Sequence, residues 1–224
     1  MLAEIEQKEL KELVVEAERR ETIQRRTDLD FYKLTMGQFV ERNFPRVEVE
    51  YELINRDKRA RLKDYISKAS LEAEIRRIKE LHLSAREALY ISRLGEGKSF
   101  DDEFIKKMSE GELPMPIVIE DDGDLKVTVK GEWSKAIWWE TYLLSAINEL
   151  YFVKKTDTFD HDELLDEGRR RLWEKIEILK QHPEIKFIEF GTRRRFSFDW
   201  QEEVVATLKS ELPGNLIGTS NVHL

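Results

Sequence analysis

Residues 185–221 read IKFIEFGTRRRFSFDWQEEVVATLKSELPGNLIGTSN, and this stretch decides the fold. Residues 185–190 have the aromatic and β-branched composition of a short strand, and residues 216–217 begin a second one. Between the two strands, Asp199 is a suitable N-cap for a helix that we expect to end near Ser210. A strand, a helix and a strand at this spacing predict a βαβ unit with parallel strands.

The turn after the first predicted strand contains the run Gly191-Thr192-Arg193-Arg194-Arg195. In α/β barrels the carboxyl ends of the strands form the active face, and the N-terminus of the following helix attracts anions. Arginine binds carboxylates and phosphates in a planar, bidentate manner. The run is therefore either an anion site or a solvated basic loop that pairs with the acidic residues of this protein.

Two further segments are candidates for ligand contact. Gly218-Thr219-Ser220-Asn221 follows the second predicted strand, where small residues let a ligand approach the backbone, although most such stretches are ordinary turns. Tyr32 lies in the segment 27–36, where its ring either stacks on a flat ligand or packs in the core.

The rest of the chain predicts a mixed helical and antiparallel region ahead of this parallel layer. Hydrophobic periodicity predicts helices over about 2–22, 31–43, 59–110 (broken near 83–84 and 95–98), 137–152 and 161–181. It predicts strands over 47–55, 117–119 and 125–129, the last two joined by an Asp-Gly turn. The fold class expected is α+β followed by the beginning of a parallel α/β layer.

Composition excludes several classes of function. The chain has no cysteine, so disulfides, thiolate catalysis and cysteine-ligated metals are excluded. Its net charge of −8 makes nucleic acid an unfavourable partner. No stretch approaches the roughly 18 consecutive apolar residues of a membrane span, and the charged start is unlike a signal peptide. We therefore expect a cytoplasmic protein.

The four histidines suggest no metal site. His82, His161, His182 and His223 are not spaced as ligand pairs, and surface or capping roles suit them better. There is also no Gly-rich dinucleotide fingerprint and no P-loop. No metal ligand is predicted.

Three segments together resemble the nicotinate phosphoribosyltransferase family. TDLDFYKLTMGQFV (27–40) resembles the N-terminal signature of that family. IEFGTRRRFSFDWQ (188–201) and GTSNVHL (218–224) are similar to its "EFGTRRRFS" and "GTSNV" motifs, in the same order and at matching separations. The resemblance covers residues 27–224.

The resemblance implies a type II phosphoribosyltransferase fold. Residues 27–182 are then an α/β N-terminal domain, and residues 183–224 are the first strands and helix of an irregular α/β barrel. Residues 1–26 are an additional N-terminal segment. The barrel is expected to be incomplete.

The family reaction joins nicotinate to phosphoribosyl pyrophosphate with ATP. It gives nicotinate mononucleotide, pyrophosphate, ADP and phosphate, and it serves NAD salvage. The resemblance implies ATP and Mg²⁺ as cofactors and a homodimer with a shared active site.

The same resemblance assigns roles to matching residues. Phe190 and Tyr32 would sandwich the nicotinate ring, with Tyr32 supplied by the partner subunit. Arg193 would meet the nicotinate carboxylate or a nearby phosphate, and Arg194 is a second candidate for that contact. The other residues expected in the pocket are Gly191, Thr192, Thr219 and Ser220.

The family's phosphorylatable histidine follows the GTSNV motif in a later segment. His223 comes immediately after the motif and is not its equivalent, so no residue is assigned as catalytic. We expect a fragment that makes no nicotinate mononucleotide from ATP and phosphoribosyl pyrophosphate, which an assay of the purified chain tests. Three alternatives stay open: a related enzyme for nicotinamide or quinolinate, a non-catalytic ligand-binding protein, and an acidic helical interaction protein.

Overall fold

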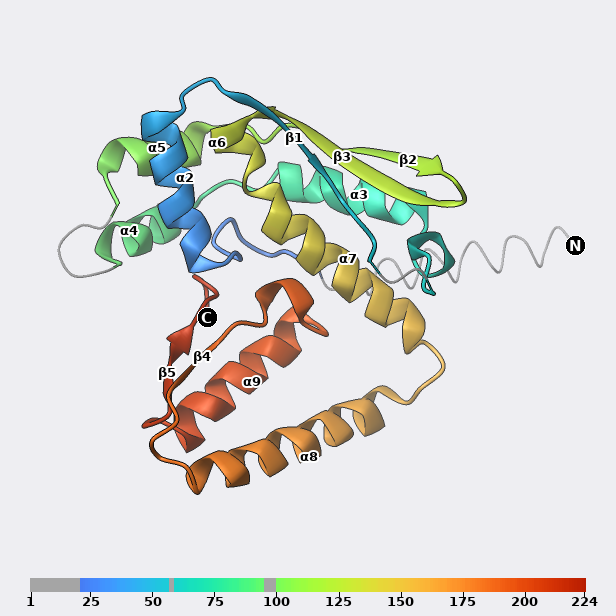
Figure 1. Cartoon of the computed structure of the whole chain (residues 1–224), viewed down its shortest axis with the longest axis vertical. Coiled ribbons are helices and arrows are strands. Elements are labelled where there is room, and N and C mark those ends of the chain that lie inside the picture. Colours follow the sequence, from blue (N-terminus) through green and yellow to red (C-terminus); the bar gives the residue numbers. More distant parts are fainter. Residues whose placement is uncertain (1–20, 57–58, 95–99) are drawn as a thin grey trace, which may run out of the picture.

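The computed structural model describes residues 21–56, 59–94 and 100–224. The helix expected over 2–22 lies almost wholly outside these residues, as does the break expected at 95–98. In Figure 1 the elements up to α7 (Trp139–Lys155) form the upper part of the molecule. The later helices and strands form the lower part, and α7 runs along the boundary between the two.

The upper part contains a three-stranded antiparallel sheet in the order β1-β3-β2. Its strands are β1 (Glu48–Glu52), β2 (Ile117–Asp121) and β3 (Asp124–Glu132). Asp122 and Gly123 join β2 to β3 with φ values of 48° and 74°, the two positive angles that a tight hairpin turn requires. The predicted hairpin is confirmed.

One face of β1 is exposed to solvent, because glutamates alternate with apolar residues along the strand. Glu50 and Glu52 point to solvent and pair with Lys130 and Lys126 of the neighbouring β3 at 3.2 and 3.3 Å. The residues that alternate with them pack against the core. These exposed cross-strand pairs contribute little stability, and the register depends on the buried face.

Helices surround this sheet and bury its inner face. They are α2 (Phe31–Asn43), α3 (Lys68–Lys79), α4 (Ala85–Arg93), α5 (Asp102–Glu110), α6 (Trp133–Ala136) and α7, together with the 3-10 turn η1 (Leu62–Asp64). The most apolar predicted helix is thus present as α7, preceded by the short α6. Trp139 and Tyr142 of α7 are fully buried, and the helix is the central element of the main core.

The lower part is the predicted βαβ unit. It contains α8 (His161–Lys180), β4 (Phe187–Glu189), η2 (Thr192–Arg194), α9 (Phe198–Glu211) and β5 (Leu216–Thr219). Strands β4 and β5 pair in parallel, as predicted. The predicted N-cap is wrong: the N-cap is Ser197, two residues before Asp199, and α9 begins at Phe198. Ser197 is extended, and its hydroxyl accepts a hydrogen bond from the Trp200 amide at 3.1 Å.

A second, smaller core belongs to the lower part. Leu172 and Ile176 of α8 pack with Leu208 of α9 and with Leu212, which directly follows that helix. This packing places α8 against α9 of the βαβ unit, and the N-terminal domain expected over residues 27–182 stays a prediction. The charged sequence of α8 concealed this packing, since so few of its residues are buried.

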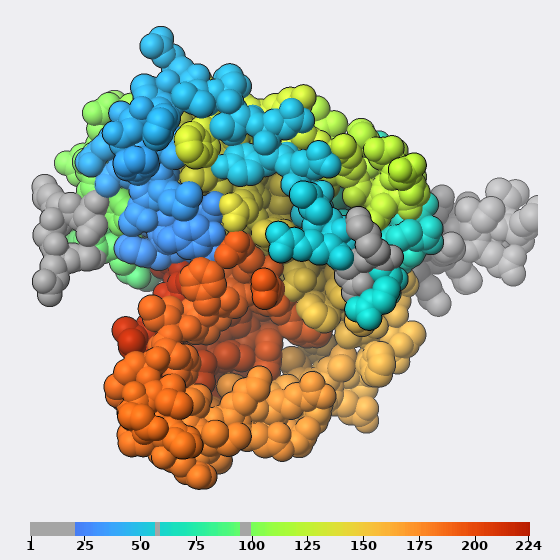
Figure 2. Space-filling view, viewed as in Figure 1, coloured from blue at the N-terminus to red at the C-terminus, as the bar shows by residue number. Residues whose placement is uncertain are grey.

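The two parts meet beside the N-terminus of α2. Figure 2 shows the orange and red lower part in contact with the blue segment around α2 and with the yellow α7. The chain after β5 forms a bridge from Asn221 to Asp30, and the Phe31 amide donates to the Ser220 carbonyl at 2.6 Å. This junction brings the three quoted motifs together.

Candidate active site

Two aromatic rings face each other at the junction. Tyr32, in the first turn of α2, and Phe190, directly after β4, have ring centroids 6.1 Å apart and planes 15° apart. Phe190 is 55% exposed, so its ring is partly open to solvent. The structure brings both rings together within one chain, whereas we expected a partner subunit to supply Tyr32.

Arg193 lies beside both rings. Its guanidinium carbon is 5.7 Å from the Tyr32 centroid and 5.8 Å from the Phe190 centroid. The Nε atom is 3.0 Å from Asp30 Oδ2, and Nη1 donates to Glu140 Oε1 at 2.9 Å. The contact with Asp30 is an ion pair by distance but not a well-aligned hydrogen bond, since Oδ2 accepts none. Nη2 donates no hydrogen bond to any described residue.

Glu140, in the first turn of α7, contacts three residues of this site. It accepts from Arg193, from the Tyr32 hydroxyl at 3.4 Å and from Lys33 Nζ at 2.5 Å. Burial and the negative charge of Glu140 raise the pKa of Tyr32 to about 12, so this phenol stays neutral. Glu140 therefore fixes one aromatic ring and the guanidinium relative to each other.

Lys33 makes Glu140 important for stability. The Lys33 side chain is 1% exposed, and Glu140 is its ion-pair partner among the described residues. We predict that Glu140→Ala lowers the free energy of unfolding by about 3 kcal/mol, because it leaves a buried ammonium uncompensated. Lys33→Met should cost less than about 1 kcal/mol, because Glu140 keeps Arg193 and partial solvation. Urea titrations of both variants test this, and an equal or larger loss in Lys33→Met would contradict it.

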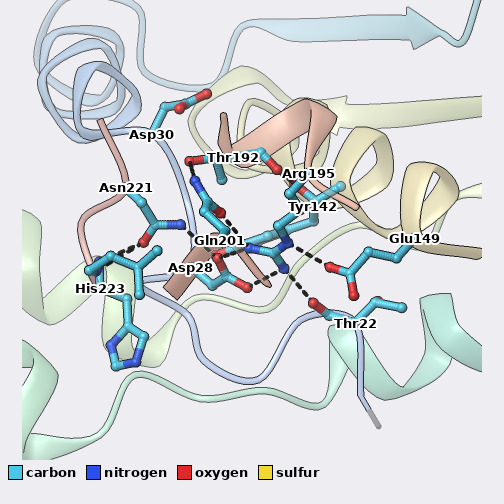
Figure 3. A network of polar contacts seen from close by, with 12 residues as sticks. Thr22, Asp28, Asp30, Tyr142, Glu149, Thr192, Arg195, Gln201, Asn221 and His223 are labelled. Atoms are coloured by element: carbon cyan, nitrogen blue, oxygen red, sulfur yellow. Dashed lines mark hydrogen bonds and ion pairs between the residues drawn. The ribbon is translucent and has the colours of Figure 1, made fainter. Parts of the chain in front are cut away.

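A buried polar network lies beneath these residues (Figure 3). Its centre is Arg195, whose side chain is 1% exposed. Arg195 donates to both Asp28 oxygens at 2.7 and 2.8 Å, to Glu149 at 2.6 Å and to the Thr22 carbonyl at 2.5 Å. Asn221 adds a bond to Asp28 at 2.9 Å. The guanidinium thereby joins its own turn to the stretch 22–28 and to α7, and Asn221 is connected to it through Asp28.

The charged groups of this network alter one another's pKa values. Burial raises the pKa of Glu149 above its ordinary value, and Arg195 opposes that shift only in part. Burial alone would lower the pKa of Arg195, but Asp28 and Glu149 raise it above its ordinary value. Arg195 therefore stays charged and is fully engaged by the protein. It is the arginine of the run that holds the fold.

The remaining predicted site residues make contacts within the protein at this junction. Thr192 is fully buried, and its carbonyl accepts from Ser145 at 2.9 Å. A side chain at Gly191 would come within 2.3 Å of Glu189. The Thr219 hydroxyl donates to Glu189 at 2.6 Å, and that of Ser220 donates to Asp30 at 2.8 Å. Ser220 thus reaches the site through Asp30.

Arg194 differs from both neighbouring arginines. Its side chain is exposed and forms no ion pair or hydrogen bond within the described part of the chain, whereas its backbone amide donates to the Gly191 carbonyl at 2.8 Å. His223 stacks on Phe198 at 5.6 Å, away from the paired rings. Burial and Arg25 lower the pKa of His223. Among the described residues no three His, Asp or Glu side chains are grouped so as to hold a metal ion, and no helix is long and apolar enough to span a membrane.

Sequence reasoning missed Glu140 and Glu149. Both are acidic residues that interrupt the apolar stretch of α7. That interruption was the available signal, since acidic residues in a buried helix require partners. Asp28 and Asp30, which precede α2, pair with arginines from the lower part of the molecule.

Two family models match the chain. The model described as the nicotinate phosphoribosyltransferase N-terminal domain matches residues 27–148. The model described as the nicotinate phosphoribosyltransferase family matches residues 185–224. Between them they include Tyr32, Glu140, Phe190 and the arginine run.

Solved structures give the same assignment. A nicotinate phosphoribosyltransferase from Porphyromonas gingivalis is 27% identical, with a TM-score of 0.76 over 90% of this chain and 50% of that one. One from Vibrio cholerae is 25% identical, with a TM-score of 0.75 over 91% and 48%. A putative one from Saccharomyces cerevisiae is 27% identical, with a TM-score of 0.72 over 92% and 52%. The chain spans about half the length of these structures.

Proposed function

This chain belongs to the nicotinate phosphoribosyltransferase family, and on that basis we propose that Tyr32, Phe190 and Arg193 form a pocket for nicotinate. The observation that supports the proposal best is the parallel pair of rings with a guanidinium at its edge. A flat aromatic acid fits this arrangement, because its ring can lie in the slot between Tyr32 and Phe190 and its carboxylate can bind Arg193.

The slot needs a small opening to admit a ring. Two stacked layers at about 3.5 Å require about 7 Å between the outer rings. The Tyr32 and Phe190 centroids are 6.1 Å apart, less than this separation, so the rings must move apart before nicotinate can enter between them. Phe190 is the ring that moves, because it is half exposed and Tyr32 is held by Glu140.

Arg193 would then orient the ligand. Asp30 and Glu140 engage its Nε and Nη1, which leaves Nη2 to donate to the nicotinate carboxylate. Arg194 would meet the phosphates of phosphoribosyl pyrophosphate, because it is exposed and uncompensated in the described part of the chain. Arg193 and Arg194, which the sequence could not distinguish, are thereby given different ligand groups.

The reaction that we propose for the whole enzyme joins the two substrates. The ring nitrogen of nicotinate forms a bond to the anomeric carbon of the ribose, and the bond from that carbon to pyrophosphate breaks with its electron pair. Positive charge develops on the ribose carbon, so positioning and charge stabilisation dominate catalysis. The stacking slot holds the attacking nitrogen in place.

The same proposal includes NAD salvage, ATP coupling, a homodimer and a cytoplasmic location. The family membership supports these features, and no residue described in this chain is assigned to them. Because no candidate metal-holding group occurs among the described residues, no step is assigned to Mg²⁺.

Binding selectivity tests the proposal. We expect calorimetry to show the 224-residue chain binding nicotinate at least tenfold more tightly than nicotinamide, because a charge-assisted hydrogen bond is lost with the carboxylate. Arg193→Gln should abolish this preference, and Arg194→Gln should preserve it. Tighter binding of nicotinamide or quinolinate would favour the related enzymes, and the absence of binding by any of the three would overturn the proposal.

A further inference from the structure

A cavity of about 310 Å³ lies in the upper part, outside the nicotinate site. It is open on one side and is lined by the C-terminal half of α2, by α5 and the turn after it, and by α6, which lie beside one another in Figure 1. Its volume is within the usual range for small-molecule sites. None of the pocket residues discussed above lines it.

Arg26 lines this cavity and is the unusual residue in it. The residue is 3% exposed, and it forms no ion pair with any described residue. Its Nε atom is buried without a hydrogen bond, and Nη2 makes one long contact of 3.4 Å to the Met108 carbonyl. Buried arginines are normally paired, as Arg195 is in this same chain. A buried guanidinium that faces a cavity, with no ion-pair partner among the described residues, indicates an anionic ligand.

The walls of the cavity restrict the kind of anion. They include the buried side chains of Phe104, Met108, Leu113 and Trp138. An occupant therefore has an apolar body as well as its charge, and an aromatic or branched aliphatic group suits these walls.

The rim of the cavity restricts the charge of the ligand. Lys107 pairs with Glu41 at 2.8 Å and Lys135 with Glu132 at 3.0 Å, so these four charges are satisfied locally. Glu110 and Glu112 are exposed at the same rim. A phosphate would bring additional negative charge against these carboxylates, whereas a carboxylate matches the single guanidinium.

We propose that the cavity at Arg26 is a binding site for a small monocarboxylate with an apolar body. The site is connected to the junction through a short stretch of chain. The Tyr142 hydroxyl donates to the Arg26 carbonyl at 2.6 Å, and two residues later Asp28 enters the Arg195 network. A ligand that holds Arg26 would therefore also hold the segment that leads to Tyr32.

Calorimetry with benzoate tests the proposal. All proteins should contain Phe190→Ala, so that the stacking pocket does not contribute and the result is independent of the proposed function. We expect saturable 1:1 binding of benzoate, weakened at least tenfold by Arg26→Gln. Arg25→Gln is the matched control, because it removes the same charge from an exposed neighbouring residue and should leave the affinity within twofold.

One further variant and one further ligand complete the experiment. Arg26→Lys keeps the charge but loses the planar fork, so it should weaken benzoate severalfold, and it replaces Arg26→Gln if that variant does not fold. Inorganic phosphate should bind at least tenfold more weakly than benzoate. The proposal is overturned if benzoate does not bind, if Arg26→Gln and Arg26→Lys leave its affinity unchanged, or if phosphate binds more tightly.

Discussion

Replacing Arg195 with methionine is expected to lower the free energy of unfolding by about 3–5 kcal/mol at neutral pH. Methionine approximates the volume of the aliphatic stem but leaves Asp28 and Glu149 as buried carboxylates without their shared cation. A total stability of about 5–15 kcal/mol is typical of a protein domain, so this loss removes a large part of it. Urea denaturation followed by circular dichroism measures the change.

Arg194 supplies the matched control. Arg194→Met makes the same chemical change one residue away, at an exposed side chain without an ion pair among the described residues, and should cost less than about 0.5 kcal/mol. A loss below about 1 kcal/mol in Arg195→Met would contradict a central role for this guanidinium.

The Arg195→Met defect should depend on pH in a defined direction. The pKa of Glu149 is already raised by burial, and removing Arg195 removes the main interaction that lowers it. A carboxyl group whose pKa is raised in the folded state favours folding when protonated, and this contribution is lost as the pH rises from the ordinary glutamate pKa through the folded value. The defect should therefore be smaller at pH 5 than at pH 8, and Glu149→Gln in the same background should reduce that difference.

The second large effect concerns the ligand. We expect Phe190→Ala to weaken nicotinate binding by about 10- to 100-fold, because it removes one side of the stacking slot. The stability of the free chain should change little, since the ring is 55% exposed. Calorimetric titration together with thermal unfolding separates these two consequences.

Phe159 provides the comparison for that variant. It is a similarly exposed phenylalanine, at 62%, in the turn between α7 and α8. Phe159→Ala should leave the nicotinate affinity unchanged. If both variants weakened binding equally, the effect would come from a general loss of order and the stacking role of Phe190 would be wrong.

The sequence was sufficient for the elements with strong local signals. The Asp-Gly hairpin, the βαβ unit and the wet face of β1 were predicted because turn chemistry and alternation are local properties. The start of α9 was missed because Ser197 and Asp199 are both good caps, and the choice between them depends on the backbone of the preceding turn.

The sequence predicted which residues belong to the site, but it did not predict which of them are buried and which face the ligand. Three adjacent arginines look alike in a sequence. In the structure Arg193 faces the rings, Arg194 faces solvent and Arg195 is buried, because the η2 turn points successive side chains in different directions. The partners that distinguish them, such as Glu140 and Glu149, are more than 40 positions away along the chain. Such long-range pairing has no local signal.

The most direct measurement of the central claim is the pattern of intermolecular nuclear Overhauser effects between nicotinate and the 224-residue chain with labelled phenylalanine and tyrosine. We predict contacts from the nicotinate ring protons to one phenylalanine and one tyrosine ring, with the phenylalanine contact missing in Phe190→Ala and the tyrosine contact missing in Tyr32→Leu. Nicotinate that binds without contacts to either ring, or with contacts unchanged in both variants, would contradict the account.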